Sequence, residues 1–577
     1  MKLHHLKLQG QYKGLSEQSF DFHNSQGNIL AFIGLNGSGK SQLLELIAET
    51  FAYLERVMRA DFINTPLGIA VEMVYQLSGA TNHSAGNDPM TCGSPTAICG
   101  GVTNPKFKVS IDVEGIILAH IWGENEWLEI SIDALETPDH IVGYASGLNE
   151  NLQRSFMKNA VQFYEIARIR LSRHRELNRA VDEAHIADIN QRYLSRSSYA
   201  FQPLPMGTFK ADGTADPNAE LVLSEPPTPL PKMFYMDYDS SALLLASFAI
   251  LADEEINELL KEIKYRLPRK IVLRYDLRTG VAIKDAISDI ELLARIGGEN
   301  AVRGIGRGTT LDQYEDYGLD HLAGFITLDV SNSAVKERLR DAHFNDPVAL
   351  FQRLYKLQLL GVKNWQGADR QALLKDNFIG TVKKPLKTKL PLAVTKLELS
   401  NDEGKCIDFD DLSDGEVQLM QIVAAARIFG QKHTLFIFDE PETHLNPSWR
   451  TYFHQHLANA LQQPNNQIQT QVLLSSHSPF MISSLKRSDV YCFERNDNKI
   501  EMEPASDETY GASFEVLIKQ YFNLRSLISQ TAVTDIKQHL PDSDDTDPEK
   551  RSQARQWIEQ HLGDSMEKAY LLGKLQD

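Results

Sequence analysis

Cysteine is scarce in this chain, with four residues among 577. They stand far apart or in one loop, and none belongs to a closely spaced set of metal ligands: Cys92, Cys99, Cys406 and Cys492. A fold stapled by disulfides or built around zinc is therefore not expected. Four free thiols are typical of a reducing compartment, so we expect a cytoplasmic protein.

Long hydrophobic runs are also missing. No run approaches the roughly 18 uninterrupted apolar residues that span a bilayer, so we expect no contact with a membrane. Residues 1–8 alternate like a strand and lack the apolar core of a signal peptide.

Positive charge is in deficit, since 59 Lys and Arg stand against 77 Asp and Glu, a net charge of −18. Proteins that bind nucleic acid over a broad surface are usually basic. Any contact with nucleic acid must therefore be local, or must belong to a partner subunit.

The chain's 577 residues are too many for one simple core, and they predict two or three structural units. Alternating segments over 106–133 predict a β-meander, and residues 150–200 have a helical pattern. Two polar or proline-rich stretches, 78–105 and 203–232, are expected to be loops. We expect a first lobe over 1–150, a mostly helical insertion over 151–389, a second α/β lobe over 390–505 and a helical segment over 506–577.

A phosphate-binding loop is the strongest motif. It follows a short apolar strand, Asn28–Ile33, and precedes a helical pattern over Gln42–Leu54. Glycines let backbone N–H groups and the helix N-terminus surround a triphosphate, with Lys40 on the β- and γ-phosphates and the Ser41 hydroxyl on Mg²⁺. The predicted nucleotide ligands are Gly34, Leu35, Asn36, Gly37, Ser38, Gly39, Lys40, Ser41 and Gln42.

Two carboxylates end a strand that is apolar enough to lie in the centre of a parallel sheet, Thr434–Phe438. Carboxyl ends of such strands are where α/β sheets bind ligands. Asp439 is predicted to hold Mg²⁺, and Glu440 to orient and deprotonate the attacking water. The alternative is a strand that simply ends in solvent with acidic residues.

Two weaker signals follow the same order as nucleotide-site elements. Ser413 and Glu416 form a capping box before a helix over Val417–Ile428, which alone predicts only an ordinary helix start. His477 follows the apolar strand Val472–Leu474, where it suits contact with a γ-phosphate but also suits a structural role.

Together these motifs resemble the ATP-binding-cassette (ABC) superfamily, in its soluble branch with the repair, condensation and overcoming-lysogenization ATPases. The resemblance covers about 1–80 and 390–505. It implies an α/β fold class: an ABC-ATPase head (a P-loop NTPase with a mixed sheet and a β-meander lobe) formed by 1–150 and 390–505, a helical insertion, and a helical C-terminal segment over 506–577 that binds a partner.

The resemblance also implies a homodimer or higher homo-oligomer, with two ATP molecules between the Lys40 loops and the signatures of opposite chains. The loop 441–447 would cross that interface, and Gln153 or Asn149 would fill the place of a glutamine loop. The implied signature contacts are Ser413, Asp414, Gly415 and Glu416.

Two short blocks, Tyr144–Glu150 and Glu508–Ser513, look like restriction-system-associated ATPases, including the PtuA ATPases of Septu anti-phage systems and of some retrons. This narrower resemblance implies slow ATP hydrolysis that regulates a PtuB-like HNH nuclease subunit in phage defence. Retron RNA or DNA is a further partner that it implies.

Other functions stay open at this stage. An acidic cluster over 542–547 lies in a proline-bounded loop, which favours a solvated linker over a nuclease metal site. Basic stretches at 168–179, 264–278 and 383–389 are more typical of solvated faces, although each could contact phosphates or an acidic partner. A DNA-repair or DNA-structure-sensing ATPase without a nuclease partner, and a scaffold that hardly hydrolyses ATP, are the alternatives.

Overall fold

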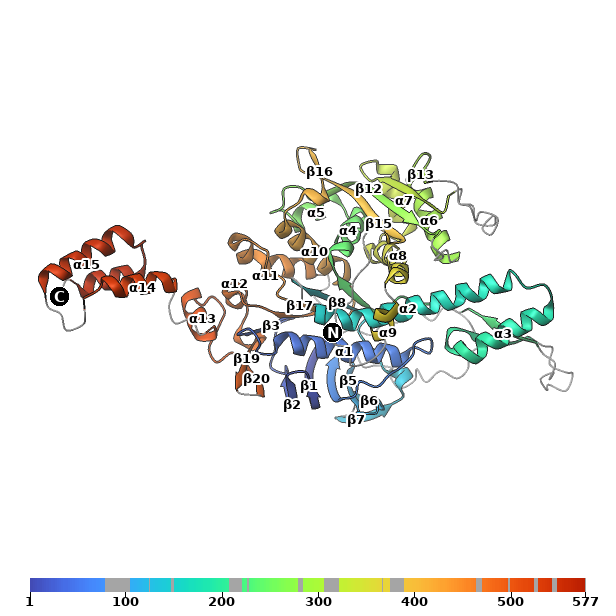
Figure 1. Ribbon diagram of the computed structural model, residues 1–577, viewed down its shortest axis with the longest axis horizontal. Helices are drawn as coiled ribbons and strands as arrows, with labels where there is room; N and C mark the ends of the chain where they lie inside the picture. The colour runs from blue at the N-terminus through green and yellow to red at the C-terminus, as the bar shows by residue number, and fades with distance from the viewer. Residues whose placement is uncertain are drawn as a thin grey trace. The chain divides into compact units, whose positions relative to one another are not determined.

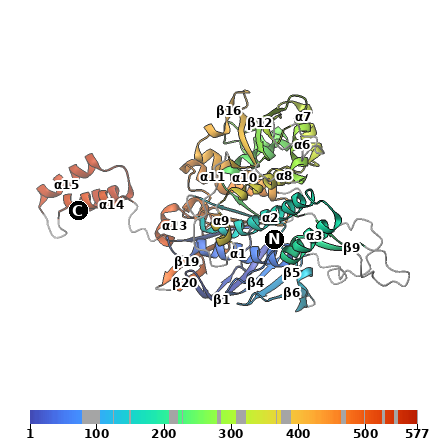
Figure 2. The same ribbon diagram turned by 45° about the vertical axis from the view of Figure 1, so that its right-hand side comes forward.

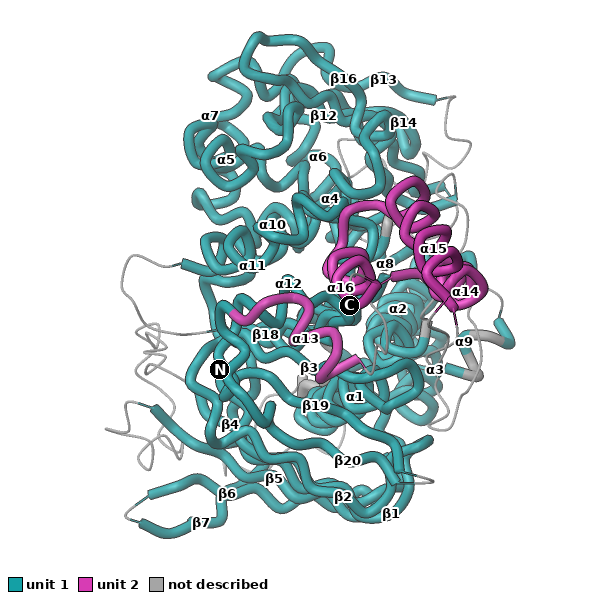
Figure 3. Tube along the Cα trace, turned by 90° about the vertical axis from the view of Figure 1, so that its left-hand side faces the viewer, with its two compact units in different colours: residues 1–511 teal, residues 512–577 magenta. Residues whose placement is uncertain are grey.

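The computed structural model describes residues 1–77, 104–123, 125–146, 150–206, 220–225, 228–278, 284–305, 321–365, 367–373, 389–462, 470–496, 499–522, 528–541 and 547–575. The chain forms two compact units, residues 1–511 and residues 512–577 (Figure 3). The expected boundary at 505/506 lies near this division. The expected boundaries at 150 and 389 do not split the first unit, because strands from both sides of the insertion share one sheet.

A seven-stranded sheet forms the centre of the first unit, in the order β11-β8-β17-β18-β3-β19-β20. All neighbours run parallel except the last pair, β19 and β20. Strands β3, β17 and β18 are buried along their whole length, as their continuous apolar runs predict. The strands are β3 (Ile29–Gly34), β8 (His140–Ala145), β11 (Met233–Met236), β17 (Thr434–Asp439), β18 (Thr470–Ser475), β19 (Val490–Asn496) and β20 (Lys499–Pro504).

A second, antiparallel sheet has the order β2-β1-β4-β5-β6-β7 and contains the predicted β-meander. Helix α1 (Lys40–Met58) lies between this sheet and the central one (Figure 1), and apolar side chains from all three elements share one core. The strands are β1 (Lys2–Tyr12), β2 (Leu15–Asp21), β4 (Ala70–Gln76), β5 (Lys106–Ile111), β6 (Ile117–Gly123) and β7 (Glu126–Ile130).

Helices cover the other face of the central sheet and extend to one side of it (Figure 2). The helical pattern over 150–200 is confirmed by α2 (Glu150–Leu177) and α3 (Glu183–Ser197). The other helices of this unit are α4 (Tyr238–Ser247), α5 (Asp253–Leu259), α6 (Lys284–Gly297), α7 (Ser333–Ala342), α8 (Pro347–Leu359), α9 (Gly367–Leu373), α10 (Asp414–Phe429), α11 (Pro447–Leu461) and α12 (Pro479–Ser483).

The region expected to be a mostly helical insertion also contains strands. β12 (Leu267–Asp276), β13 (Val302–Gly304) and β14 (Ala323–Asp329) join β15 (Leu392–Ser400) and β16 (Cys406–Asp408) in a five-stranded antiparallel sheet. The expected loop over 203–232 likewise contains an antiparallel pair, β9 (Gln202–Met206) and β10 (Glu220–Ser224). The prolines at 203 and 205 predict a loop rather than the strand β9. Both strands of a two-stranded pair are edge strands, and edge strands tolerate proline.

The second unit is helical as predicted, with α13 (Phe514–Tyr521), α14 (Gln530–His539), α15 (Pro548–His561) and α16 (Met566–Lys574). Several predictions fall outside the described residues: the loop over 78–103 with two cysteines, Asn149, the acidic residues 542–546 and the basic residues 383–388. None of the described helices combines the length and the apolar character needed to span a bilayer.

Candidate nucleotide-binding site

The predicted site residues gather where three central strands end. The phosphate loop leaves β3 at Gly34, the paired acids follow β17, and the segment with His477 follows β18. The register places Asp439 opposite Ser475, and Ser475 opposite Phe32. Because these parallel strands end at one edge of the sheet, residues about 400 positions apart lie side by side.

Two glycines of the loop occupy positions that no other residue suits. Gly34 has a φ of +144°, and a Cβ there would lie 2.3 Å from the carbonyl oxygen of Phe493. Gly39, with a φ of +100°, is the N-cap of α1, and its Cβ would lie 2.5 Å from Cδ1 of Ile500. The loop therefore keeps a bare backbone that can approach a triphosphate closely.

The tip of the loop is exposed while its base is buried. Leu35, Asn36 and Gly37 are exposed, whereas Ser38 is buried. Arg495 on β19 donates to the carbonyl oxygen of Gly37 at 3.2 Å and holds the tip from outside. The sequence contained no signal for this arginine.

Lys40 is buried within the loop, where its ammonium donates to the carbonyl oxygens of Gly34 (2.9 Å) and Leu35 (3.1 Å). Burial lowers the pKa of Lys40 to about 8, although nearby Glu440 and Asp439 act in the opposite direction. The next predicted ligand, Gln42, accepts the backbone N–H of Gly14 through its side-chain oxygen at 3.1 Å.

Ser41 and Asp439 form the predicted metal pair. The Ser41 hydroxyl donates to Asp439 Oδ1 at 2.9 Å, and Ser475 donates to the same oxygen. Mg²⁺ takes oxygen ligands at about 2.1 Å. Because the Ser41 hydroxyl and the Asp439 carboxylate already lie in contact, both oxygens can bind one such ion. This donor set fits the Mg²⁺ that a triphosphate would bring.

Glu440 has a strained backbone and a specific partner. Its φ is +51°, a region that non-glycine residues rarely adopt, and its N–H donates to both the Ser475 carbonyl (3.2 Å) and hydroxyl (3.0 Å). Its Oε1 lies 3.3 Å from Nε2 of His477, and this hydrogen bond is the main reason why the pKa of Glu440 is lowered. The two predicted catalytic side chains are therefore in contact, and Glu440 is ionised and able to accept a proton.

The predicted signature lies at the start of α10. The Ser413 hydroxyl caps the helix by accepting from Glu416 N–H at 3.4 Å, and the Glu416 carboxylate accepts from Ser413 N–H at 2.9 Å. Ser413 and Asp414 are exposed, and the Cβ that Gly415 lacks would lie 3.0 Å from the carbonyl oxygen of His444. The structure thus places the helix start against the loop that follows the paired acids.

Comparison with known proteins gives one family match. A family model described as an AAA domain, putative AbiEii toxin of a type IV toxin–antitoxin system, matches residues 209–483. That stretch contains Ser413, Asp439 and His477, and the phosphate loop lies before it. A search of curated proteins found no match.

The chain has a P-loop NTPase fold.

Solved structures with similarity to this chain include heads of structural-maintenance-of-chromosomes (SMC) proteins. The SMC head domain from Thermotoga maritima has 10% identity and a TM-score of 0.29, covering 88% of this chain and 100% of that one. An Smc head from Pyrococcus furiosus, bound to the C-terminal domain of ScpA, has 12% identity and a TM-score of 0.28, covering 91% and 100%. Because these scores are low, the assignment rests on the motifs and sheet order of the chain itself.

One buried residue near the candidate site was not assigned a role by the sequence. Glu442, two positions beyond Glu440, is 4% exposed, and its Oε1 accepts from the Ser476 hydroxyl. Its other oxygen, Oε2, has no hydrogen-bond partner among the described residues. Burial raises the pKa of Glu442 to about 7. Glu442 links the loop after β17 to the segment that carries His477.

Two arginines of the first basic stretch, 168–179, make contacts inside the protein. Arg170 donates to the carbonyl oxygen of Ala200 at 3.0 Å, and Arg173 pairs with Glu225 at 3.1 Å. Both arginines are buried. These two side chains hold α2 against its neighbours, so neither belongs to the solvated face that the sequence favoured for this stretch.

Proposed function

We propose that this chain is an ABC-type ATPase that binds two ATP·Mg²⁺ between two head-to-head copies and hydrolyses ATP slowly. Its closing and opening would regulate a partner HNH nuclease in anti-phage defence. The observation that supports this most is the meeting of Lys40, Ser41, Asp439, Glu440 and His477 at one edge of the central sheet.

Each side chain has a role that its surroundings suit. Lys40 exchanges its two carbonyl partners for phosphate oxygens, and Ser41 and Asp439 hold the metal ion. Glu440, ionised beside His477, orients a water molecule and accepts its proton. His477, in contact with Glu440, lies where its ring N–H can donate a hydrogen bond to the terminal phosphate.

The second half of the site would come from another copy. Ser413 and Asp414 are exposed at the N-terminus of a 16-residue helix, whose first N–H groups and dipole favour an anion. An exposed helix start next to the loop of His444 offers one contiguous surface to a second nucleotide site. Closure of the dimer is a two-state element that a nuclease subunit could sense.

A repair ATPase that grips DNA through its own basic groove is less well supported. Arg170 and Arg173 are occupied inside the first unit. We therefore place any nucleic-acid contact on a partner subunit, or on a local part of the surface.

The test is the variant Glu440→Gln, which keeps the shape of the side chain but cannot accept a proton from water. We expect unchanged ATP affinity, ATP turnover reduced by about a hundredfold or more, and a long-lived ATP-bound dimer seen by light scattering. Lys40→Ala is the control, because it should lose ATP binding and remain monomeric. Equal dimer populations with and without ATP in Glu440→Gln would contradict the proposal. If an HNH subunit encoded by a neighbouring gene fails to copurify with the chain, the defence role is contradicted.

A further inference from the structure

Helix α10 holds the backbone of His444 at two points, and His444 belongs to the loop that follows the paired acids. Gly415 lies so close that a Cβ there would be 3.0 Å from the carbonyl oxygen of His444. Gln418, which is 3% exposed, accepts the N–H of His444 through its Oε1 at 3.0 Å. Residues three positions apart share one face of a helix, so the first turns of α10 and this loop are joined along that face.

The side-chain amide of Gln418 can take only one orientation. A backbone N–H only donates, so the amide oxygen must face His444, and the amide nitrogen donates to the Tyr144 hydroxyl at 2.9 Å. Burial raises the pKa of Tyr144 to about 12, so this hydroxyl is neutral and adds no charge to the buried contact. Gln418 therefore connects α10 both to the loop and to the end of β8.

The same loop is also linked to the paired acids. Thr443 donates through its hydroxyl to the carbonyl oxygen of Glu440 at 2.9 Å, and it accepts from the hydroxyl of Ser146, the residue after β8, at 3.1 Å. His444 is the next residue of the loop, so a continuous path of bonds runs from Glu440 to Gln418.

Arg450 on α11 stiffens this path. Its guanidinium donates to the carbonyl oxygens of Thr443 at 2.7 Å and Leu445 at 2.9 Å, which lie on either side of His444 in the chain. Because both neighbouring residues are held, the loop transmits a displacement to the start of α10 instead of absorbing it.

We propose that Gln418 is a positioning residue, which makes the placement of Ser413 depend on whether the same copy holds ATP at its own phosphate loop. Glu440 and its loop take a new position when they meet a bound triphosphate, and Gln418 carries that change to the start of α10. Ser413 is then presented to the nucleotide of the second copy. This inference rests on the proposed function, because it needs both the ATP site and the signature.

Coupling of this kind is reciprocal. If ATP in one copy improves the docking of that copy's Ser413, then docking must tighten ATP binding in the same copy by the same factor. The two sites of a dimer therefore fill together.

The experiment is hydrogen–deuterium exchange of the full chain with Mg²⁺ and a non-hydrolysable ATP analogue, at a concentration where light scattering shows only monomer. We expect backbone amides over 412–421 to exchange at least about threefold more slowly when the analogue is bound. Lys40→Ala, which should not bind the analogue, should show no change. Unchanged exchange over 412–421 in wild-type chain that has bound the analogue would overturn the inference and leave the ATP site standing, whereas an analogue that does not bind refutes both.

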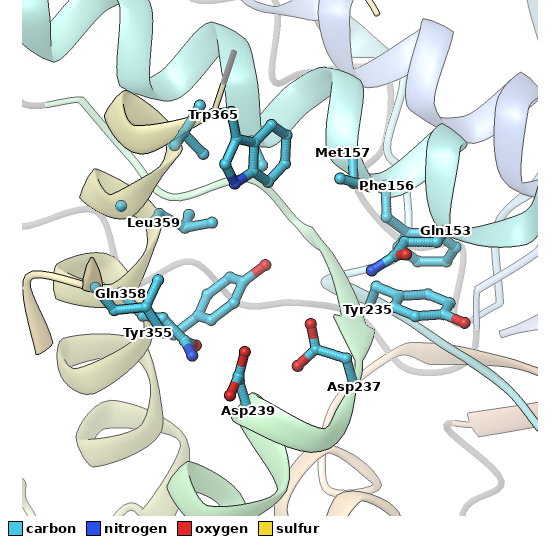
Figure 4. Close-up of a pocket in the computed structure, with 14 residues that line it drawn as sticks. Gln153, Phe156, Met157, Tyr235, Asp237, Asp239, Tyr355, Gln358, Leu359 and Trp365 are labelled. Carbon is cyan, nitrogen blue, oxygen red and sulfur yellow. The ribbon is translucent and has the colours of Figure 1, made fainter. Parts of the chain in front are cut away.

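Two variants on the same helix separate this role from general packing. Gln418→Met keeps the length of the side chain but loses both hydrogen bonds. The matched control is Gln421→Met, since Gln421 is 4% exposed and donates to the carbonyl oxygen of Asp237 at 3.3 Å, beside the cavity that Figure 4 shows.

We expect both variants to bind the analogue about as tightly as wild type. Gln418→Met should lose the exchange response over 412–421 and should need at least about tenfold more protein to dimerise at saturating analogue. Gln421→Met should keep the response and dimerise like wild type. Equal behaviour of the two variants would refute the role of Gln418.

Gln418→Glu tests the hydrogen bonds themselves and replaces Gln418→Met if that variant folds poorly. A carboxyl group can accept from the His444 N–H and bond to the Tyr144 hydroxyl in either protonation state. We expect glutamate to keep the exchange response that methionine loses. Loss of the response in Gln418→Glu with the analogue bound would show that these hydrogen bonds are not the link.

Discussion

Glu442 shows how much of the site depends on burial that a sequence does not display. Lys40, Ser41, Asp439 and Glu440 stand in recognisable motifs, so their meeting could be predicted. Glu442 is an acid in an acidic segment, and only the structure shows it enclosed and bonded to Ser476. A buried carboxyl beside a catalytic one costs stability when it ionises.

We expect Glu442→Gln to stabilise the protein at neutral pH. The folded pKa of about 7 lies above the ordinary value of 4.5, so the folded state holds a proton that the unfolded state has lost. Stability therefore falls as pH rises from about 4.5 to about 7, by up to about 3 kcal/mol. Thermal unfolding should show the variant more stable than wild type at pH 8 and little different at pH 4.

The control for this comparison is Glu254→Gln, an exposed residue on α5, whose effect should not change over the same pH range. If Glu442→Gln shows the same difference from wild type at both pH values, the carboxyl does not titrate in this window.

The lowered pKa of Lys40 predicts that the protein takes up a proton when it binds ATP in mildly alkaline solution. Its pKa of about 8 without nucleotide should rise when phosphates replace the carbonyl partners, since anions favour the ammonium form. Affinity should then fall above pH 8, by up to about tenfold per pH unit. Calorimetry at pH 9 in two buffers of different ionisation enthalpy measures the uptake, and at pH 6.5 the two enthalpies should agree.

At the scale of elements, the sequence predicts correctly those features that neighbouring residues determine. The apolar runs of β3 and β17 and the capping box of α10 are determined by neighbouring residues, and the structure confirms all three. The pair β9 and β10 was missed because the prolines at positions 203 and 205 are typical of a loop. The sheet of β12 to β16 was underestimated because its order depends on pairings across more than a hundred residues.

The start of α10 allows helix capping to be separated from a role at the nucleotide. Ser413→Asn keeps a good cap but removes the hydroxyl, whereas Ser413→Ala removes both and costs about 1 kcal/mol of stability. We expect both variants to lose most ATP turnover and ATP-dependent dimerisation, while only alanine lowers the melting temperature. If asparagine is as active as serine, then Ser413 is only a helix cap.

At the scale of the whole molecule, the second unit is our candidate for binding the proposed HNH partner. Its last helix, α16, exposes two large side chains four positions apart, Met566 (73%) and Tyr570 (68%). Exposed apolar residues on one helix face are typical of protein interfaces.

We therefore expect Met566→Ser combined with Tyr570→Ser to reduce copurification of the HNH partner by about tenfold or more, without changing ATP binding. The control is Lys574→Ser on the same helix. Retention of the partner by the double variant would place the interface elsewhere.

The position of β3 has a consequence for how the protein is made. Its two neighbours, β18 and β19, belong to the last fifth of the chain. While a ribosome synthesises the polypeptide, β3 and the loop with Lys40 leave the exit tunnel long before β18 and β19 have been made. Such an unpaired strand is prone to aggregate. The phosphate loop can therefore take its final place at the edge of the central sheet only after residue 496 has left the exit tunnel.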